Sequence, residues 1–249
     1  MHKTAIVVPC YNEASRLDAE AFVRALAQRP WLEFLFVNDG STDATCEVLE
    51  RIVRGGRASV LDLEANAGKA EAVRRGVLEA LRGDAEAVGY WDADLAAPLT
   101  ELDAMIEALF ARDAFLVIGS RVRMLGRRVE RSSVRHYLGR VFATAASCVL
   151  DLPVYDTQCG AKVMRSEELA REIFGEPFES RWIFDVEILV RIALHDRRAG
   201  TTVLRERVVE HPLGAWSHVS GSRLKVLDFG RAALDLARIS RGMGRSRPT

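Results

Sequence analysis

Hydrophobic residues in the first half of the chain occur in short runs rich in β-branched and aromatic side chains, separated by segments with helical spacing. Runs of this length and composition are typical of buried strands. They predict five strands, at residues 4–8, 32–37, 59–63, 87–91 and 115–118. Polar turns separate each run from the segment that follows it, so we expect the strands to alternate with helices.

The intervening segments place apolar residues on one side of a helix. The polar triplet Ser41-Thr42-Asp43 is suited to cap a helix, and it precedes the stripe Val48, Leu49, Ile52 and Val53. A second stripe follows Gly68 and consists of Ala72, Val73, Gly76, Val77, Ala80 and Leu81. Alternating strands and helices indicate βαβ units, so we predict an α/β fold with a central, mostly parallel sheet flanked by helices.

The second half has a less regular pattern. Its expected elements are an arginine-rich turn, a helix, a loop and two further helices, at 121–135, 138–150, 155–162, 186–194 and 222–240. A basic tail at 241–249 is expected to be mobile. Because the 249 residues contain neither an internal repeat nor a low-complexity linker, we predict a single domain with halves at 1–120 and 121–240.

Composition adds little to this fold but disfavours several classes of protein. Hydrophobic residues make up 49% and charged residues 28%, with 35 basic and 35 acidic side chains, as in an ordinary folded domain. This balance gives no support for a nucleic-acid partner. The cysteines form no CxxC pair, so neither a zinc ribbon nor a disulfide framework is indicated, and a reducing compartment is expected.

The apolar runs also bear on membranes. The run at 4–8 is too short for a signal peptide and ends at Pro9. No apolar stretch approaches the roughly 20 residues that span a bilayer. We therefore expect a cytoplasmic protein, with any membrane contact peripheral and on the cytoplasmic face.

Candidate chemistry gathers where the predicted strands end. Asp92-Ala93-Asp94 follows the run 87–91, and two close carboxylates repel one another unless a cation joins them. One or two carboxylates completed by diphosphate oxygens suit Mg²⁺ or Mn²⁺. Asp92 and Asp94 are therefore the predicted metal ligands. The structural alternative is a turn in which an Asp caps the segment before Pro98.

Two more polar turns end the first two predicted strands, within the sequences VPCYNE and FVNDGSTD. Asp39 could accept hydrogen bonds from a base or ribose, and Gly40 would allow the backbone to approach closely. Asp39-Gly40 is also an ordinary turn dipeptide. Ligands of open α/β sheets gather at the carboxyl ends of the strands, so we expect both turns at one site.

Asn66-Ala67-Gly68-Lys69 opens the next predicted helix. Free N–H groups at a helix start, together with a lysine, suit an anion such as a diphosphate. Ala70 stands where a Walker sequence has Ser or Thr, and no GxGxxG follows the first strand. These differences disfavour a P-loop NTPase and a dinucleotide-binding dehydrogenase.

In their order and spacing, the segments VVPCYNEASRL, FVNDGSTD, NAGKAEAVRRG and WDADLAAP resemble the inverting nucleotide-sugar glycosyltransferases of glycosyltransferase family two. Three later segments, YDTQCGAK, RWIFDVE and WSHVSGS, are similar to the dolichyl-phosphate and other polyprenyl-phosphate beta-glucosyltransferases. The resemblance covers nearly the whole chain. It implies the GT-A fold, in which a Rossmann-like nucleotide-binding half is continuous with an acceptor half, and a divalent metal, Mg²⁺ or Mn²⁺.

The resemblance also implies roles for individual residues. Those expected to contact the nucleotide sugar are Pro9, Tyr11, Asn12, Glu13, Asp39, Asn66, Gly68, Lys69, Asp92, Ala93 and Asp94. Asp94 is implied to be the more direct metal ligand, with Asp92 closer to the ribose. The expected acceptor-binding residues are Arg121, Arg131, Arg135, Gln158 and Lys162. The chain departs from the family's usual residues at Asn38, Ala70, Ala96 and Ala161.

Asp156 and Asp185 are the candidate catalytic bases. A base is needed if the acceptor is a sugar hydroxyl, but a lipid phosphate already arrives as an anion. Either carboxylate could instead cap a helix or orient an arginine. The arginine-rich run between residues 121 and 140 suits a lipid phosphate or an anionic membrane surface, or it forms a solvated basic face.

The leading hypothesis is transfer of glucose from UDP-glucose to a polyprenyl or dolichyl phosphate, with GDP-mannose as the other possible donor. Two alternatives stay open. One is a glycosyltransferase that acts on a hydroxyl acceptor, soluble or polymeric. The other is a nucleotide-sugar binding module without catalysis.

Overall fold

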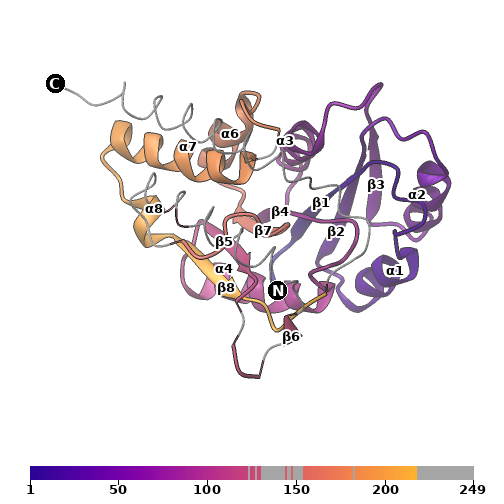
Figure 1. Cartoon of the computed structure of the whole chain (residues 1–249), viewed down its shortest axis with the longest axis horizontal. Helices are drawn as coiled ribbons and strands as arrows, with labels where there is room; N and C mark the ends of the chain where they lie inside the picture. Colours follow the sequence, from indigo (N-terminus) through magenta and orange to yellow (C-terminus); the bar gives the residue numbers. More distant parts are fainter. Residues whose placement is uncertain are drawn as a thin grey trace.

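A computed structural model describes residues 1–122, 124–126, 128–129, 144, 147, 154–181 and 183–217. Its centre is a seven-stranded sheet in the order β3-β2-β1-β4-β7-β5-β8 (Figure 1). The strands are β1 (Thr4–Cys10), β2 (Leu32–Asn38), β3 (Ala58–Asp62), β4 (Ala87–Trp91), β5 (Leu116–Ser120), β7 (Ala161–Arg165) and β8 (Val208–Pro212). A separate pair joins β6 (Arg128–Val129) to β9 (Ala215–Trp216).

Neighbouring strands of the central sheet are parallel except at β7, which runs antiparallel to both β4 and β5. The parallel strands β1 to β4 are connected through helices, so their carboxyl ends lie on one edge of the sheet. The prediction of an α/β fold with a mostly parallel central sheet is confirmed.

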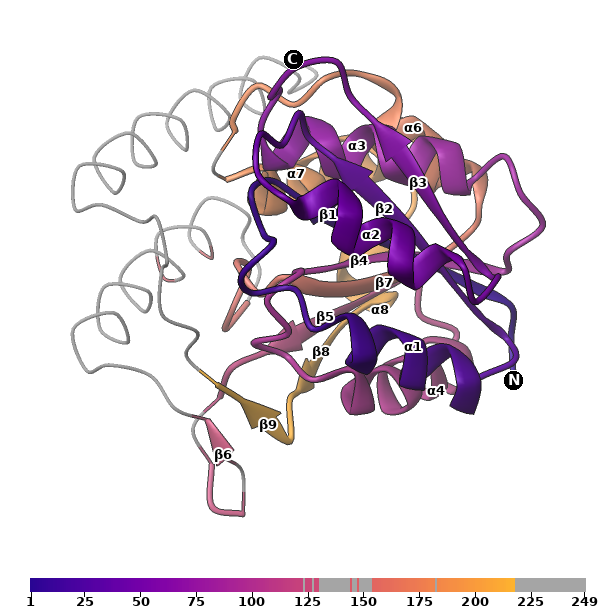
Figure 2. The same cartoon turned by 90° about the vertical axis from the view of Figure 1, so that its right-hand side faces the viewer.

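Helices cover the two faces of this sheet in separate groups (Figure 2). On one face lie α1 (Ala19–Gln28), α2 (Thr45–Val53) and α4 (Leu102–Ala111). On the other lie α3 (Lys69–Ala80), α6 (Glu168–Gly175) and α7 (Phe184–Ala199). Two short helices, η1 (Leu99–Glu101) and α8 (Val203–Glu206), precede α4 and β8. Consecutive residues of β1 point to opposite faces, so Val7 packs with α3 whereas Val8 packs in the cluster on the other face.

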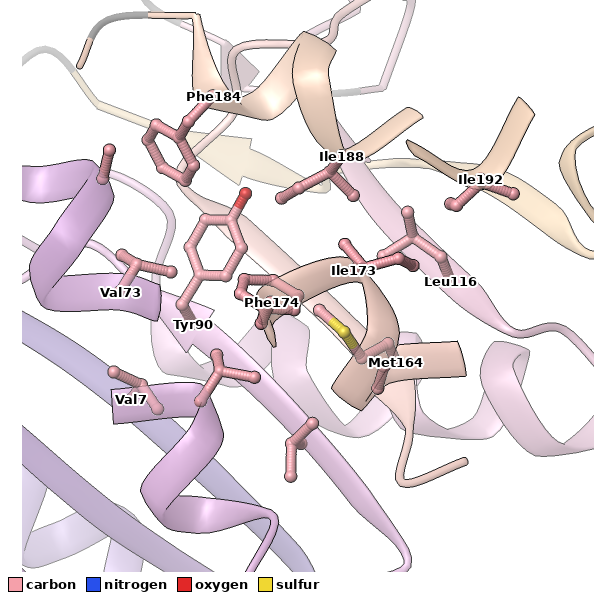
Figure 3. Packing of buried hydrophobic residues seen from close by; sticks show 14 of the residues in the cluster. Val7, Val73, Tyr90, Leu116, Met164, Ile173, Phe174, Phe184, Ile188 and Ile192 are labelled. Atoms are coloured by element: carbon pink, nitrogen blue, oxygen red, sulfur yellow. The ribbon is translucent and has the colours of Figure 1, made fainter. Parts of the chain in front are cut away.

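The core on the α3 and α7 side is built around Tyr90, which is fully buried (Figure 3). Val73 of α3 and Phe174 of α6 lie beside its ring. Phe184, the first residue of α7, lies near the hydroxyl end, with its ring centroid 5.8 Å from that of Tyr90. The packing that buries Tyr90 therefore fixes the start of α7 close to the carboxyl end of β4.

All five predicted strands are present, with ends shifted by up to two residues. The loop expected at 155–162 is wrong at its end, because Ala161 and Lys162 belong to β7. Lys162 is fully buried, so a charged residue occupies a core position and interrupts the apolar pattern that marks a strand. Pro212 and the charged Glu210 have the same effect on β8.

The helix expected at 186–194 is confirmed as the longer α7, whose C-cap residue is Gly200 with a φ of 69°. The predictions for 222–240, 241–249, Arg131 and Arg135, and nearly all of the helix expected at 138–150, lie outside the described residues. Within the described ranges, no helix is long and apolar enough to cross a membrane. The single-domain prediction stays a prediction, although β7 and β8 of the second half complete the sheet begun by the first.

Candidate active site

The carboxyl ends of β1, β2 and β4 meet at one edge of the sheet, next to the start of α3. This edge brings together the loops in which the sequence predicts a nucleotide-sugar site. The residues expected from the first loop are half-buried here; they are Pro9, Tyr11, Asn12 and Glu13.

Hydrogen bonds fix the loop after β1 to the loop after β2. Asn12 has a φ of 52°, and its N–H donates to Ser41 Oγ at 3.0 Å. Asn12 Oδ1 accepts the Thr42 N–H at 2.8 Å, and the Glu13 N–H donates to Thr45 Oγ1 at 2.8 Å. Asn12 and Glu13 therefore shape this edge through loop-to-loop contacts.

Asp39 is buried, and the loop before α3 uses both of its carboxylate oxygens. Oδ1 accepts the Ala67 N–H at 2.7 Å, and Oδ2 accepts the Gly68 N–H at 2.9 Å and Asn66 Nδ2 at 3.0 Å. Gly40 permits this approach, because a Cβ there would lie 2.7 Å from the Asn66 nitrogen. Asp39 thus positions the loop that leads to Lys69, and its expected bond to a base or ribose stays a prediction.

Asp92, Ala93 and Asp94 follow β4 in a tight turn. Asp94 Oδ1 accepts the Ala96 N–H at 3.1 Å, and Leu95 has a φ of 51°. This bond matches the alternative of a turn before Pro98, but neither Asp caps the following helix η1, because Pro98 is its N-cap residue and no side chain caps it. Both carboxylates stay partly exposed at the edge of the sheet.

The charges at this edge favour a further cation. Burial and the neighbouring Asp92 carboxylate raise the pKa of Asp94 above its ordinary value. Lys69 Nζ lies 2.5 Å from Asp92 Oδ1, and 41% of the Lys69 side chain is exposed. Partial burial lowers the pKa of Lys69, but the carboxylates of Asp92, Asp185 and Asp94 outweigh burial and raise it. The carboxylates of Asp92 and Asp94 therefore attract a cation, and their oxygens are of the kind that binds Mg²⁺ or Mn²⁺.

A loop from the second half of the chain packs directly against Asp92. The Asp92 N–H donates to the Gly160 carbonyl oxygen at 2.9 Å. A Cβ at position 160 would lie only 1.9 Å from Asp92 Oδ2, so the carboxylate occupies the space that glycine leaves free. Among the described residues, no group of three or more His, Cys, Asp or Glu side chains is placed to hold a metal ion.

Asp156, one of the two candidate bases, is buried in an ion pair. Arg121 Nε and Nη2 donate to its two oxygens at 2.6 and 2.7 Å, and the Arg121 N–H adds a bond of 3.1 Å. Glu210 on β8 accepts the Asp156 N–H at 2.8 Å. Asp156 therefore orients an arginine, as one of the sequence alternatives holds, and Arg121 directs its guanidinium at this carboxylate.

Asp185, the other candidate base, lies in a buried polar cluster with Lys162 and Tyr90. It does not cap α7, whose N-cap is Ile183 without a side-chain bond. Lys162 Nζ forms an ion pair with Asp185 Oδ1, which also accepts the Tyr90 hydroxyl at 2.5 Å. Lys162 Nζ further donates to the carbonyl oxygens of Thr157 and Cys159 at 3.0 and 2.8 Å.

This cluster corrects the expectation for Lys162. The side chain is fully buried, and its ammonium holds the 157–159 loop to the start of α7, so it is not placed to contact an acceptor. Gln158, which belongs to the same loop, is only half-buried. Tyr90 and Lys162 connect the two halves of the chain beneath the Asp92 turn.

Two further cations near this edge are not among the predicted site residues. The Arg181 side chain lies against the start of α3, since a Cβ on Gly68 would be 3.6 Å from Arg181 Cδ. Arg16 is ion-paired with Glu13, and its charge acts to lower the pKa of Asp94. A single arginine in a loop belongs to no sequence pattern that would identify it as a site residue.

Comparison with known sequences shows the family of this chain. Residues 5–173 match the profile of the family Glycosyl transferase family 2. A dolichyl-phosphate beta-glucosyltransferase of Trichomonas vaginalis is 32% identical over 250 residues, which cover 95% of this chain and 72% of that protein. The dolichyl-phosphate beta-glucosyltransferase of Saccharomyces cerevisiae is 29% identical over 256 residues, covering 93% and 72%.

Solved structures share the fold. Glucosyl-3-phosphoglycerate synthase from Mycobacterium tuberculosis, in complex with Mn²⁺, uridine diphosphate and phosphoglyceric acid, superposes with a TM-score of 0.65 and 19% identity, covering 100% of this chain and 80% of that chain. The mannosyltransferase PcManGT from Pyrobaculum calidifontis, in complex with GDP-Man and Mn²⁺, gives 0.64 and 19%, covering 100% and 66%. The fold is thus that of a GT-A glycosyltransferase, and this chain belongs to glycosyltransferase family 2.

Proposed function

We propose that this glycosyltransferase transfers glucose from UDP-glucose to a polyprenyl phosphate such as dolichyl phosphate, with inversion at the anomeric carbon. The observation that carries the proposal is the similarity to dolichyl-phosphate beta-glucosyltransferases, which extends over 93–95% of this chain. It therefore includes the second half, where an acceptor would bind, as well as the nucleotide-sugar half. GDP-mannose is the competing donor.

For the donor, we propose that Asp92 and Asp94 hold Mg²⁺ or Mn²⁺ together with the diphosphate. When bound, the ion would stabilise the negative charge that develops on the departing nucleoside diphosphate. Lys69 and Arg181 lie at the start of α3, where the free N–H groups of the helix would also attract an anion. The solved neighbours with Mn²⁺ and a nucleotide or nucleotide sugar support this assignment.

The contacts of the two candidate bases support a phosphate, and not a hydroxyl group, as the acceptor. A hydroxyl acceptor must lose a proton to a carboxylate, whereas a phosphate oxygen is already ionised. Asp156 is paired with Arg121, and Asp185 with Lys162 and Tyr90, so both carboxylates have positioning contacts. We propose that Arg121, Arg131, Arg135 and Gln158 form the acceptor side, and that the protein acts on the cytoplasmic face of a membrane.

A transfer assay with labelled sugar nucleotides tests this proposal. UDP-glucose and GDP-mannose would be compared, each with polyprenyl phosphate and with hydroxyl acceptors, in the presence and absence of Mn²⁺. We expect lipid-linked glucose only with UDP-glucose, polyprenyl phosphate and the ion together. Transfer to a hydroxyl acceptor but not to the lipid phosphate would refute the proposed acceptor, and binding of UDP-glucose without any transfer would favour a binding module.

A further inference from the structure

An exposed apolar turn projects from the edge of the molecule between β5 and β6. Met124 and Leu125 form it with Gly126, which has a φ of 83°. Leu125 is fully exposed and Met124 is 53% exposed, and Met1 and Val23 are the other exposed large hydrophobic residues in the part of the chain that the structure describes. In both Figure 1 and Figure 2 the turn extends away from the central sheet.

The sequence around this turn is strongly basic. Residues 121–128 read RVRMLGRR, with arginines on both sides of Met124-Leu125 and no acidic residue. Arg121 is paired with Asp156, and the sequence of this stretch contains three further arginines. Apolar side chains at an exposed tip with arginines beside them match the boundary between lipid headgroups and acyl chains.

The base of the turn is connected to the active site by consecutive contacts. Arg128 and Val129 of β6 pair with Ala215 and Trp216 of β9. The N–H of Ser217, which follows β9, donates to the Ala96 carbonyl oxygen at 2.9 Å. The Ala96 N–H in turn donates to Asp94 Oδ1. Glu101 adds a second anchor, because it accepts the N–H groups of Gly214 and Ala215 at 2.9 and 3.2 Å.

We propose that the Met124-Leu125 turn inserts into an anionic lipid bilayer and docks the carboxyl edge of the sheet on the membrane surface. The two side chains enter the acyl boundary while the neighbouring arginines contact anionic headgroups. A polyprenyl phosphate would then reach the site from the lipid, a consequence that rests on the proposed function. Docking itself depends only on the turn and its charge.

Vesicle flotation of the full chain tests the docking without donor or acceptor. Phosphatidylcholine vesicles with and without phosphatidylglycerol would be mixed with wild-type protein, with Leu125→Asn and with the control Val23→Asn. Val23 on α1 is also an exposed apolar residue, at 41%, but lies outside the basic stretch. Because the asparagine side chain gains nothing from leaving water for the acyl boundary, we expect Leu125→Asn to weaken binding to anionic vesicles about tenfold. Val23→Asn should bind as the wild type does.

Two results would overturn the proposal. The first is wild-type protein that does not float with anionic vesicles, and the second is equal flotation of Leu125→Asn and wild type. Self-association that depends on Leu125, without vesicle binding, would instead make the turn a contact between protein molecules. UDP binding in the presence of Mn²⁺ should be the same for all variants. Normal flotation without glucose transfer would refute the proposed function but not the docking.

Discussion

At the scale of single residues, the repulsion between Asp92 and Asp94 makes a testable link between metal and nucleotide. If both carboxylates share an ion with the diphosphate, Mn²⁺ should raise the affinity for UDP. We expect Asp94→Asn to remove most of this coupling, which typically lies in the range of about 5–150-fold. Calorimetric titration of UDP with Mn²⁺ or with a chelator measures it. Asp84→Asn, in an exposed position before β4, is the control and should leave the coupling intact.

The buried pair of Lys162 and Asp185 makes a prediction about stability. Replacing Lys162 by Met removes the ammonium but leaves a buried carboxylate and two carbonyl oxygens without their donor. Loss of one partner of a buried pair typically costs about 3–5 kcal/mol, so urea unfolding should show a decrease of that order. Lys3→Met, at an exposed ion pair, should change the free energy of unfolding by less than about 1 kcal/mol. An equally small change for Lys162→Met would contradict a structural role for the pair.

At the scale of elements, a strand is predicted from the sequence when its buried positions hold apolar or small residues, and it is missed when a charged residue occupies one of them. β4 is predicted with its observed ends, because all five of its residues are buried. β7 is not predicted, because Lys162 occupies one of its buried positions. Its charge is compensated by Asp185 and by the carbonyl oxygens of Thr157 and Cys159, and the sequence does not reveal such distant partners. Arg181 and Tyr90 are not predicted as site residues for the same reason, since their partners are also distant in the sequence.

The loop between Asp156 and β7 gives a prediction at this scale. It approaches Asp92 so closely that a Cβ at Gly160 would overlap the carboxylate. Gly160→Ala should therefore displace Asp92 or the loop, and misplacement by about 1 Å can lower a catalysed rate about 10²-fold. Gly175→Ala is a matched control, since a Cβ there meets nothing within 4 Å. Single-turnover transfer would be measured for both variants, with circular dichroism as a check of folding. Unchanged transfer by Gly160→Ala would show that the loop adapts.

At the scale of the whole molecule, the two halves of the chain share one sheet and one site. β7, from the second half, lies between β4 and β5 of the first. Its neighbouring loop supplies Gly160 behind Asp92, and Lys162 connects that loop to α7. The edge that carries Asp92 and Asp94 is therefore held in place by elements of the second half. The sequence motifs predict that polar residues gather at this edge, whereas the dependence of the edge on β7 appears only in the fold.

The same connection allows the nature of the acceptor to be tested through Asp156. Its carboxylate accepts hydrogen bonds from the side chain and the backbone N–H of Arg121 and from the Gln158 N–H. If the acceptor is a phosphate, Asp156→Asn should weaken acceptor binding through Arg121 and should not change the pH dependence of transfer. A general base typically contributes about 10²–10⁴-fold, so a phosphate acceptor predicts a smaller loss at saturating acceptor.

Single-turnover transfer across a pH series separates the two roles of Asp156. Loss of a general base would leave a residual rate that rises with pH, because a hydroxyl acceptor ionises without help as the solution becomes more basic. Loss of a positioning carboxylate would leave the pH profile of the wild type and raise the acceptor KM. Glu210 accepts the N–H groups of Tyr155 and Asp156, so Glu210→Gln alters the same loop. If Asp156 is a positioning residue, Glu210→Gln should also raise the acceptor KM and keep the pH profile of the wild type. A loss beyond 10²-fold for Asp156→Asn alone, with a rate that climbs with pH, would favour a hydroxyl acceptor over a lipid phosphate.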